Sequence, residues 1–137
     1  SASSVWQGGL KDGKGTVSTE STVLSNVPYN FSKRFESEKG TNPEELIAAA
    51  HASCFSMALA HGLAGAGTPP ESLRTSATVT FVPGTGITKI ALAVTGRVPG
   101  LDEAGFREAA AGAKAGCPVS KALAGVPEIT VESRLEG

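Results

Sequence analysis

The sequence contains few cysteines and few aromatic residues. Its 137 residues include 2 cysteines, and aromatic residues make up 5% of the chain. Small secreted domains that are held together by disulfides carry many cysteines at short spacings, so this composition excludes that class. Cys54 and Cys117 do not form a CxxC motif. In a reducing compartment a pair of this kind is more often redox-active than structural.

The chain also lacks an excess of either charge. Its 12 basic and 13 acidic residues give a formal net charge of −1, with no basic arm and no acidic tail. We therefore expect neither a nucleic-acid partner nor a membrane partner. No basic segment followed by an apolar run opens the sequence, which favours a cytoplasmic protein.

One long apolar run is present, and it predicts a buried helix. Asn42 is a favourable N-cap, Pro43 suits the first helical position, and Glu44 and Glu45 suit the first turn. The run extends to about 62–65 and is apolar on nearly every face, which is typical of a buried helix. A membrane span is disfavoured because the run is rich in alanine and contains two histidines and two serines.

Alternating apolar and polar residues predict strands on both sides of this helix. Residues 5–7 and 16–19 flank an Asp-Gly step and predict a hairpin, which a short strand or loop over 29–35 follows. The strands expected after the helix cover 73–81, 89–98 and 128–135.

Two further helices are predicted before the last strand. Asp102 is the expected cap of the first, with Leu101 and Phe106 as a hydrophobic staple, and Gly116 is expected to end it. The second is short and begins at Pro118. The sequence therefore predicts a single α+β domain over residues 1–137, in the order β-β-β-α-β-β-α-α-β.

The size of the chain predicts a homodimer. One sheet covers one side of a helix, and a helix of about 20 residues that is apolar all round needs cover on its other sides too. A monomer of 137 residues provides little of that cover. Two copies with their long helices packed together in the middle would provide it.

Each cysteine has a structural and a reactive interpretation. Cys54 lies in the apolar helix, where a cysteine is usually a small hydrophobic residue. However, His51 is one turn earlier, and a nearby cation lowers the pKa of a thiol. Cys117 directly precedes Pro118 as a cap, and the free N–H groups of a helix start favour a thiolate. Whether the two thiols meet is left open at this point.

Charged residues and histidines supply further candidates. The segment 29–39 is typical of a solvated loop, although Arg34 within it would also suit a thiolate. Glu44 lies about 15 Å along the helix from Cys54, so it would act by orienting an arginine or by approaching the partner's Cys54. A zinc site is the remaining alternative, although its spacings match no strong zinc signature. Its ligands would be His51, Cys54, His61 and Cys117.

Three segments resemble the OsmC/Ohr family of bacterial organic hydroperoxide reductases. They cover residues 13–21, 34–59 and 114–120, and the similarity runs from about Trp6 to the final strand. In the OsmC branch the active-site arginine comes shortly before the Asn-Pro-Glu-Glu-Leu helix start, which is Arg34 here. The Ohr branch carries it in the N-terminal hairpin, where this chain has Lys11 and Lys14. The resemblance is therefore to the OsmC branch.

The resemblance implies a fold and a mechanism. The fold is an intertwined α+β homodimer with buried long central helices. Cys54 is the implied peroxidatic thiol and Cys117 the resolving thiol, while Arg34 stabilises the Cys54 thiolate and Glu44 holds Arg34. The implied substrate is an organic hydroperoxide and the reductant a small dithiol or a lipoylated protein, with no bound cofactor or metal. His51 has no general role in the family.

Other functions remain open from the sequence. The chain could be a non-catalytic stress-related binding module, a Cys/His metal-binding protein, or a thiol-dependent esterase or disulfide exchanger that uses Cys54. For the peroxidase, an apolar wall formed by Phe31, Phe35 and Met57 is expected to favour organic peroxides over hydrogen peroxide.

Overall fold

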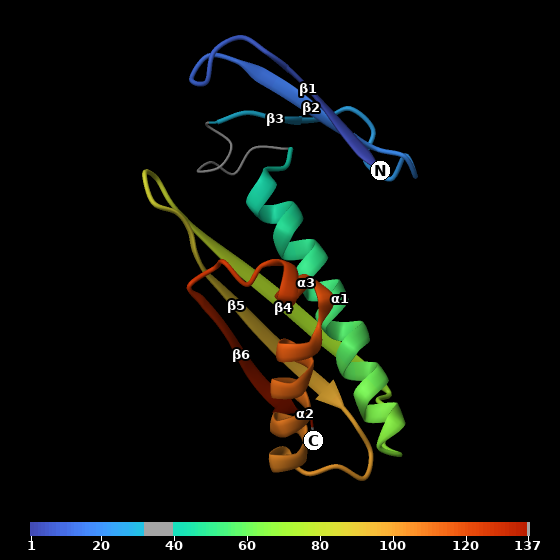
Figure 1. Ribbon diagram of the computed structural model, residues 1–137. Coiled ribbons are helices and arrows are strands. Elements are labelled where there is room, and N and C mark those ends of the chain that lie inside the picture. Colours follow the sequence, from blue (N-terminus) through green and yellow to red (C-terminus); the bar gives the residue numbers. More distant parts are fainter. Residues whose placement is uncertain (32–39, 137) are drawn as a thin grey trace. The chain divides into compact units, whose positions relative to one another are not determined.

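The computed structural model describes residues 1–31 and 40–136. Its elements follow the order β1, β2, β3, α1, β4, β5, α2, α3, β6, and the expected mixed α+β class is confirmed (Figure 1). The chain divides into two compact units, Ser1–Leu46 and Ile47–Gly137. The expectation of a single domain stays a prediction.

The first unit contains an antiparallel sheet in the order β1-β2-β3. The strands are β1 (Ala2–Gln7), β2 (Lys14–Thr19) and β3 (Val27–Tyr29). In the predicted turn, a Cβ at Gly13 would collide with the backbone of Gly9, so glycine is required there. All of β1 is exposed, and so is Val5 within it, at 62%. The single chain therefore leaves apolar residues of this sheet without cover.

The third strand lies earlier than the sequence predicted. It was expected within 29–35 and is found at Val27–Tyr29, where Tyr29 pairs with Gly15. Gly15 is the second residue of β2, so the pairing with β3 ends one residue short of the start of β2. Residues 32–39 lie outside the described part of the chain.

Helix α1 (Pro43–Gly65) begins where the capping residues predicted. The Asn42 side chain accepts a hydrogen bond from the Glu45 backbone N–H at 2.7 Å, which satisfies one of the free donors of the first turn. The Glu45 carboxylate in turn accepts a hydrogen bond from the Thr41 hydroxyl at 2.8 Å. Local hydrogen bonds therefore fix the start of the helix.

The second unit contains a mixed sheet in the order β4-β5-β6. Strand β4 (Ser72–Val82) is antiparallel to β5 (Gly86–Arg97), and β6 (Glu128–Leu135) is parallel to β5. Parallel neighbours need a crossover connection, which α2 (Glu103–Gly116) and α3 (Pro118–Ala122) provide. Helices α1 and α2 both lie on one face of this sheet (Figure 1).

The core of the second unit lies between the helices and the sheet. Every fourth residue of α1 faces it, from His51 through Phe55 and Leu59 to Leu63, and each is at most 2% exposed. The opposite face of α1 is exposed in the single chain, including Met57 at 68%. Length and composition would let α1 cross a membrane, but soluble core helices meet the same criterion. The predicted burial of α1 is therefore confirmed for one face of the helix.

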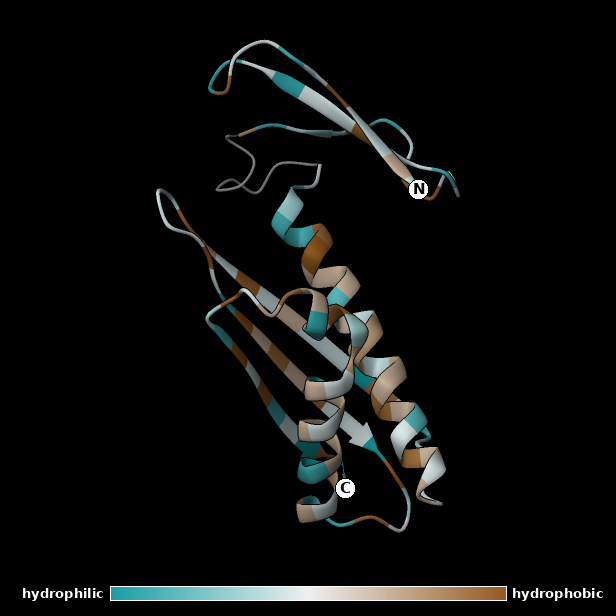
Figure 2. Ribbon diagram, viewed as in Figure 1, coloured by the Kyte–Doolittle hydropathy of each residue, from teal (hydrophilic) through white to brown (hydrophobic). Residues whose placement is uncertain are grey.

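Helix α2 is fixed at its start and against the sheet. Asp102 caps it by accepting a hydrogen bond from the Gly105 N–H at 2.8 Å, as the sequence predicted. Phe106 is fully buried, and a Cβ at Gly96 would lie 2.6 Å from its Cζ atom. The close approach of the ring to β5 sets the height of α2 above the sheet. Figure 2 shows how apolar and polar residues are distributed along α1 and α2.

Candidate active site

The fold brings the two cysteines together. Cys54 comes from the middle of α1, whereas Cys117 ends α2 and caps α3. The Cys117 N–H bonds to the Ala113 carbonyl at 2.9 Å, and Pro118 follows as the first residue of α3, as expected. Both thiols are free, and Cys54 packs against the buried cluster that contains Cys117.

This contact makes Cys54 a weaker acid. Its hydrogen bond to Cys117 raises the pKa of the Cys54 thiol, because ionisation would destroy the donor. Burial and the neighbouring charge of an ionised Cys117 act in the same direction, and the backbone N–H of Val119 acts against them. Among the described residues nothing therefore favours a Cys54 thiolate strongly enough to reverse the shift.

Cys117 is made a stronger acid by the same contact. Burial raises the pKa of its thiol, but hydrogen bonds to the sulfur outweigh burial and the net shift is downward. The donors are Cys54, the backbone N–H groups of Ser120 and Val119, and the Ser120 hydroxyl. The Cys117 side chain makes no capping hydrogen bond at the start of α3. The direction of this shift agrees with the acidity expected from the sequence, which stays a prediction.

His51 does not supply a cation to Cys54, contrary to one sequence expectation. Its ring is fully buried, and burial lowers its pKa, so it is mainly neutral near pH 7. Its Nε2 atom lies 2.7 Å from Ser120 Oγ. The helical spacing of His51 and Cys54 was read correctly, but His51 lies on the buried stripe of α1, which turns it toward α3.

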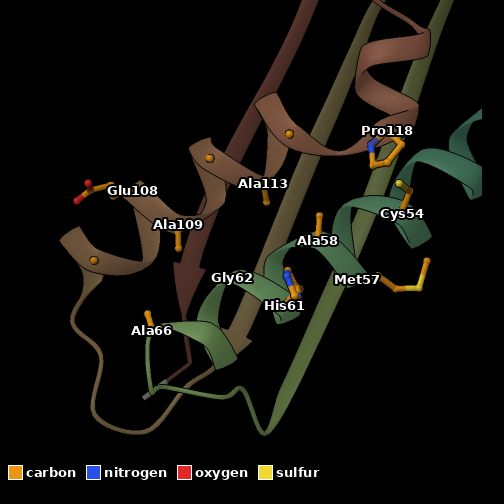
Figure 3. Close-up of a pocket in the computed structure, with 13 residues that line it drawn as sticks. Cys54, Met57, Ala58, His61, Gly62, Ala66, Glu108, Ala109, Ala113 and Pro118 are labelled. Atoms are coloured by element: carbon orange, nitrogen blue, oxygen red, sulfur yellow. The ribbon is translucent and has the colours of Figure 1, made fainter.

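Access separates the two thiols as clearly as acidity does. A groove of about 810 Å³ runs between α1 and α2, and Cys54 lies at one end beside Pro118 (Figure 3). Cys117 does not line this groove and is 0% exposed. A small molecule that enters the groove therefore reaches Cys54 first. The groove is lined by Cys54, Met57, Ala58, His61, Gly62, Ala66, Gly105, Glu108, Ala109, Gly112, Ala113, Gly116 and Pro118.

Comparison with known proteins assigns the family. The sequence profile of the family described as OsmC-like protein matches residues 36–132. "Peroxiredoxin OsmC" of Escherichia coli (strain K12) is 54% identical over 134 residues, which cover 96% of this chain and 92% of the relative. The chain belongs to the OsmC family. The match to a relative of that name also confirms the OsmC branch, which the position of Arg34 had indicated.

Solved structures of OsmC-like proteins share the fold. OhrB of Bacillus subtilis, an organic hydroperoxide resistance protein, has a TM-score of 0.66 at 25% identity and covers 99% of this chain and 98% of its own. An OsmC-like protein of Mycoplasma pneumoniae has a TM-score of 0.76 at 17% identity, covering 100% of this chain and 96% of its own. The second similarity concerns the fold alone.

The roles of Arg34 and Glu44, which the OsmC resemblance implies, stay predictions. Arg34 lies outside the described residues, and so does Phe35 of the expected apolar wall. Glu44 lies in the first turn of α1 and is half-buried. The predicted pairing of Arg34 with Glu44 is therefore not tested. Of the expected apolar wall, Met57 lines the groove beside Cys54, and Phe31 belongs to the first unit.

Sequence reasoning did not single out Ser120, which lies beside the candidate site. It is 8% exposed, its Oγ atom lies 2.7 Å from His51 Nε2, and it contributes to the lowered pKa of the Cys117 thiol. The available signal was its spacing, because a hydroxyl three residues after a capping cysteine lies on the first turn of the following helix.

The zinc alternative finds no support in residues 1–31 and 40–136. No group of three or more His, Cys, Asp or Glu side chains in this part of the chain could hold a metal ion. His51 turns to Ser120, and His61 is exposed on the groove.

Proposed function

We propose that this chain is a thiol peroxidase that reduces organic hydroperoxides to alcohols through a Cys54–Cys117 disulfide. One observation carries the proposal: an accessible thiol at the end of an apolar groove lies in contact with a second, buried and more acidic thiol. The names of two relatives, "Peroxiredoxin OsmC" and an organic hydroperoxide resistance protein, support it.

The first step uses Cys54. Its thiolate attacks the terminal oxygen of the hydroperoxide, and the O–O bond breaks. The departing alkoxide takes a proton and leaves as an alcohol, so the peroxide is reduced while Cys54 is oxidised to a sulfenic acid. Access decides this assignment, since Cys54 lines the groove and Cys117 is 0% exposed.

The second step uses Cys117. Its thiolate attacks the Cys54 sulfur, the S–O bond breaks, and hydroxide leaves and is protonated to water. An external dithiol, either a small molecule or a lipoylated protein, then reduces the disulfide by exchange and becomes a disulfide itself. The lowered pKa of Cys117 suits both steps, because it supplies an attacking thiolate and later a good leaving group.

Arg34 and Glu44 complete the proposed site. The described surroundings raise the pKa of Cys54, so a reactive thiolate there needs a cation. Arg34 is the proposed cation, since a guanidinium stays charged and can also orient a peroxide oxygen. Glu44 is proposed to hold Arg34 and to balance its charge.

The proposed active form is a homodimer with intertwined chains. Exposed apolar side chains occur in both units, including Leu10 at 60% and Met57 at 68%. In the most apolar stretch of α1, 22% of the residues are buried in the single chain, which leaves surface for a second copy. Light scattering at low protein concentration tests this, and a stable monomer would contradict it. The cytoplasmic location stays a prediction.

Substrate preference tests the function directly. The groove beside Cys54 is lined mainly by apolar atoms of small residues, so it suits the organic group of a hydroperoxide. With dithiothreitol as reductant, we expect kcat/KM for cumene hydroperoxide to exceed that for hydrogen peroxide. A higher value for hydrogen peroxide would refute the preference. No turnover of either peroxide, with a silent Cys54→Ser variant, would favour a binding module.

A further inference from the structure

The two cysteines differ in what an incoming thiol can reach. A disulfide between them is reduced when an external thiolate attacks one of the two sulfurs, and access decides which one. Cys117 is 0% exposed, belongs to the buried core cluster and does not line the groove between α1 and α2. Cys54 lines one end of that groove. Attack on Cys117 would therefore first require the core around it to open.

The groove that leads to Cys54 follows one face of α1. Its α1 wall includes a row of residues at four-residue intervals, which places them on one face of the helix: Cys54, Ala58, Gly62 and Ala66. Figure 3 shows Cys54 at one end of this row and Ala66 at the other. The two lie about 18 Å apart along the helix, at about 1.5 Å per residue. A slender molecule can thus lie along α1 with one end at Cys54.

Two glycines of the groove have no packing role in the chain itself. A Cβ at Gly62 or Gly112 would meet no other part of the described chain within 4 Å. Glycine inside a helix is less stable than alanine, and the space for alanine is present at both positions. Gly62 is on α1 and Gly112 is on α2, so both helices leave the groove wider than their own packing requires.

We propose that this groove also binds the reductant, a dithiol carried on a slender apolar arm, and that the reductant forms its mixed disulfide with Cys54. This rests on the proposed function only for the existence of the Cys54–Cys117 disulfide. One thiolate of the reductant attacks the Cys54 sulfur, the bond to Cys117 breaks, and Cys117 leaves as a thiolate. The second thiol of the reductant then attacks its own sulfur in the mixed disulfide and releases Cys54. The dithiol becomes a cyclic disulfide, and its two hydrogens end on the two cysteines.

Sharing one groove makes the peroxide and the reductant competitors. The reduced protein offers the groove to the dithiol as well as to the peroxide, and a bound dithiol keeps the peroxide from Cys54. With separate sites, a cycle of two half-reactions gives a kcat/KM for the peroxide that does not depend on the dithiol concentration. With the shared groove, kcat/KM for cumene hydroperoxide should fall severalfold as dihydrolipoamide is raised above its own KM. A constant value would overturn the sharing of the groove.

Reduction of a preformed disulfide tests the site without any peroxide. The protein is oxidised with diamide, and thiols are counted over time after dihydrolipoamide is added. We expect Gly62→Leu to slow this reduction on the order of tenfold, because leucine fills the groove. Dithiothreitol lacks the arm and should be slowed less. No slowing in Gly62→Leu, or equal slowing with both dithiols, would overturn the proposal.

Gly65→Leu is the matched control for this variant. It makes the same change in the same helix, a Cβ there also meets nothing within 4 Å, and the position lies outside the groove. We expect it to be reduced at the wild-type rate by both dithiols. Slowing of Gly65→Leu equal to that of Gly62→Leu would assign the effect to the helix and overturn the role of the groove.

A trapped mixed disulfide identifies the sulfur that is attacked. The diamide-oxidised protein is mixed briefly with 1-hexanethiol and quenched with N-ethylmaleimide under denaturing conditions, and its peptides are weighed. We expect the hexyl group on Cys54 and the maleimide on Cys117, and the reverse pattern would overturn the proposal. A protein that shows the expected pattern but does not consume cumene hydroperoxide would refute the proposed function and leave the reductant site in place.

Discussion

The two thiols touch, yet they differ in both access and acidity. Cys54 lines a groove and has a raised pKa, whereas Cys117 is fully buried and has a lowered pKa. Burial alone would have produced the opposite order, since it raises the pKa of a thiol. The donors around the Cys117 sulfur reverse that order.

This difference indicates how the two steps of a cycle can be separated. Cys117 can react only with a sulfur that comes to it, because a substrate in the groove does not reach this buried thiol. The pKa of the accessible thiol, Cys54, is raised by its described surroundings. A group outside the described residues is therefore needed to favour its thiolate. The predictions below alter access or acidity at one thiol at a time.

Removing either thiol should have the largest effect. Cys54→Ser should reduce hydroperoxide turnover by about three orders of magnitude or more, because the nucleophile is lost. Cys117→Ser should still consume one equivalent of peroxide and retain an oxygen on Cys54, since nothing resolves the sulfenic acid. Intact mass and steady-state rates measure both. Normal turnover by Cys54→Ser would reverse the assignment of the two thiols.

Arg34→Lys should be the next most damaging change. Lysine keeps the positive charge but lacks the planar guanidinium group, which can donate two parallel hydrogen bonds. We therefore expect kcat/KM for cumene hydroperoxide to fall on the order of tenfold or more. Lys33→Gln removes a neighbouring charge and is the matched control. Near-normal activity of Arg34→Lys would exclude Arg34 from the site.

Filling the groove should alter access without altering acidity. Ala109→Phe places a large side chain in the groove, and we expect KM for cumene hydroperoxide to rise on the order of tenfold. Hydrogen peroxide should be affected less, because it is small. Ala111→Phe lies on an exposed part of α2 away from the groove and is the control. Equal effects on both peroxides would show that the groove is not the substrate path.

The pH dependence of stability should show the smallest effect. Because burial lowers the pKa of His51, the unfolded chain takes up a proton more readily as pH falls below the ordinary value of 6.5. The stability contributed by neutral His51 is thus complete above pH 6.5 and is lost as pH falls toward the folded-state pKa. Each unit of pKa difference corresponds to about 1.4 kcal/mol.

Denaturation by urea between pH 5 and pH 7.5 measures this contribution. We expect His51→Gln to flatten the curve over that range, because glutamine does not titrate. His61→Gln, on the exposed face of α1, should leave the slope as it is. An unchanged slope in His51→Gln would contradict the lowered pKa.

Local features were predictable from the sequence, and contacts between distant segments were not. The start of α1 depends on Asn42, and that of α2 on Asp102, whose side chains bond to backbone three residues away. The acidity of Cys117 follows partly from its place before α3.

The contact between His51 and Ser120 joins residues 69 positions apart. It depends on how α2 packs on the sheet and where that packing delivers α3. No local pattern encodes such a placement. The neutral state of His51 was missed for the same reason, since helical spacing placed it near Cys54 but did not show its burial against α3.

The most direct test adds one equivalent of cumene hydroperoxide to fully reduced protein, followed by a count of free thiols and the intact mass. We predict that both thiols disappear with the loss of two hydrogens, and that Cys117→Ser instead gains one oxygen on Cys54. If both thiols remain while the peroxide survives, the contact between Cys54 and Cys117 is structural and the proposed peroxidase cycle is wrong.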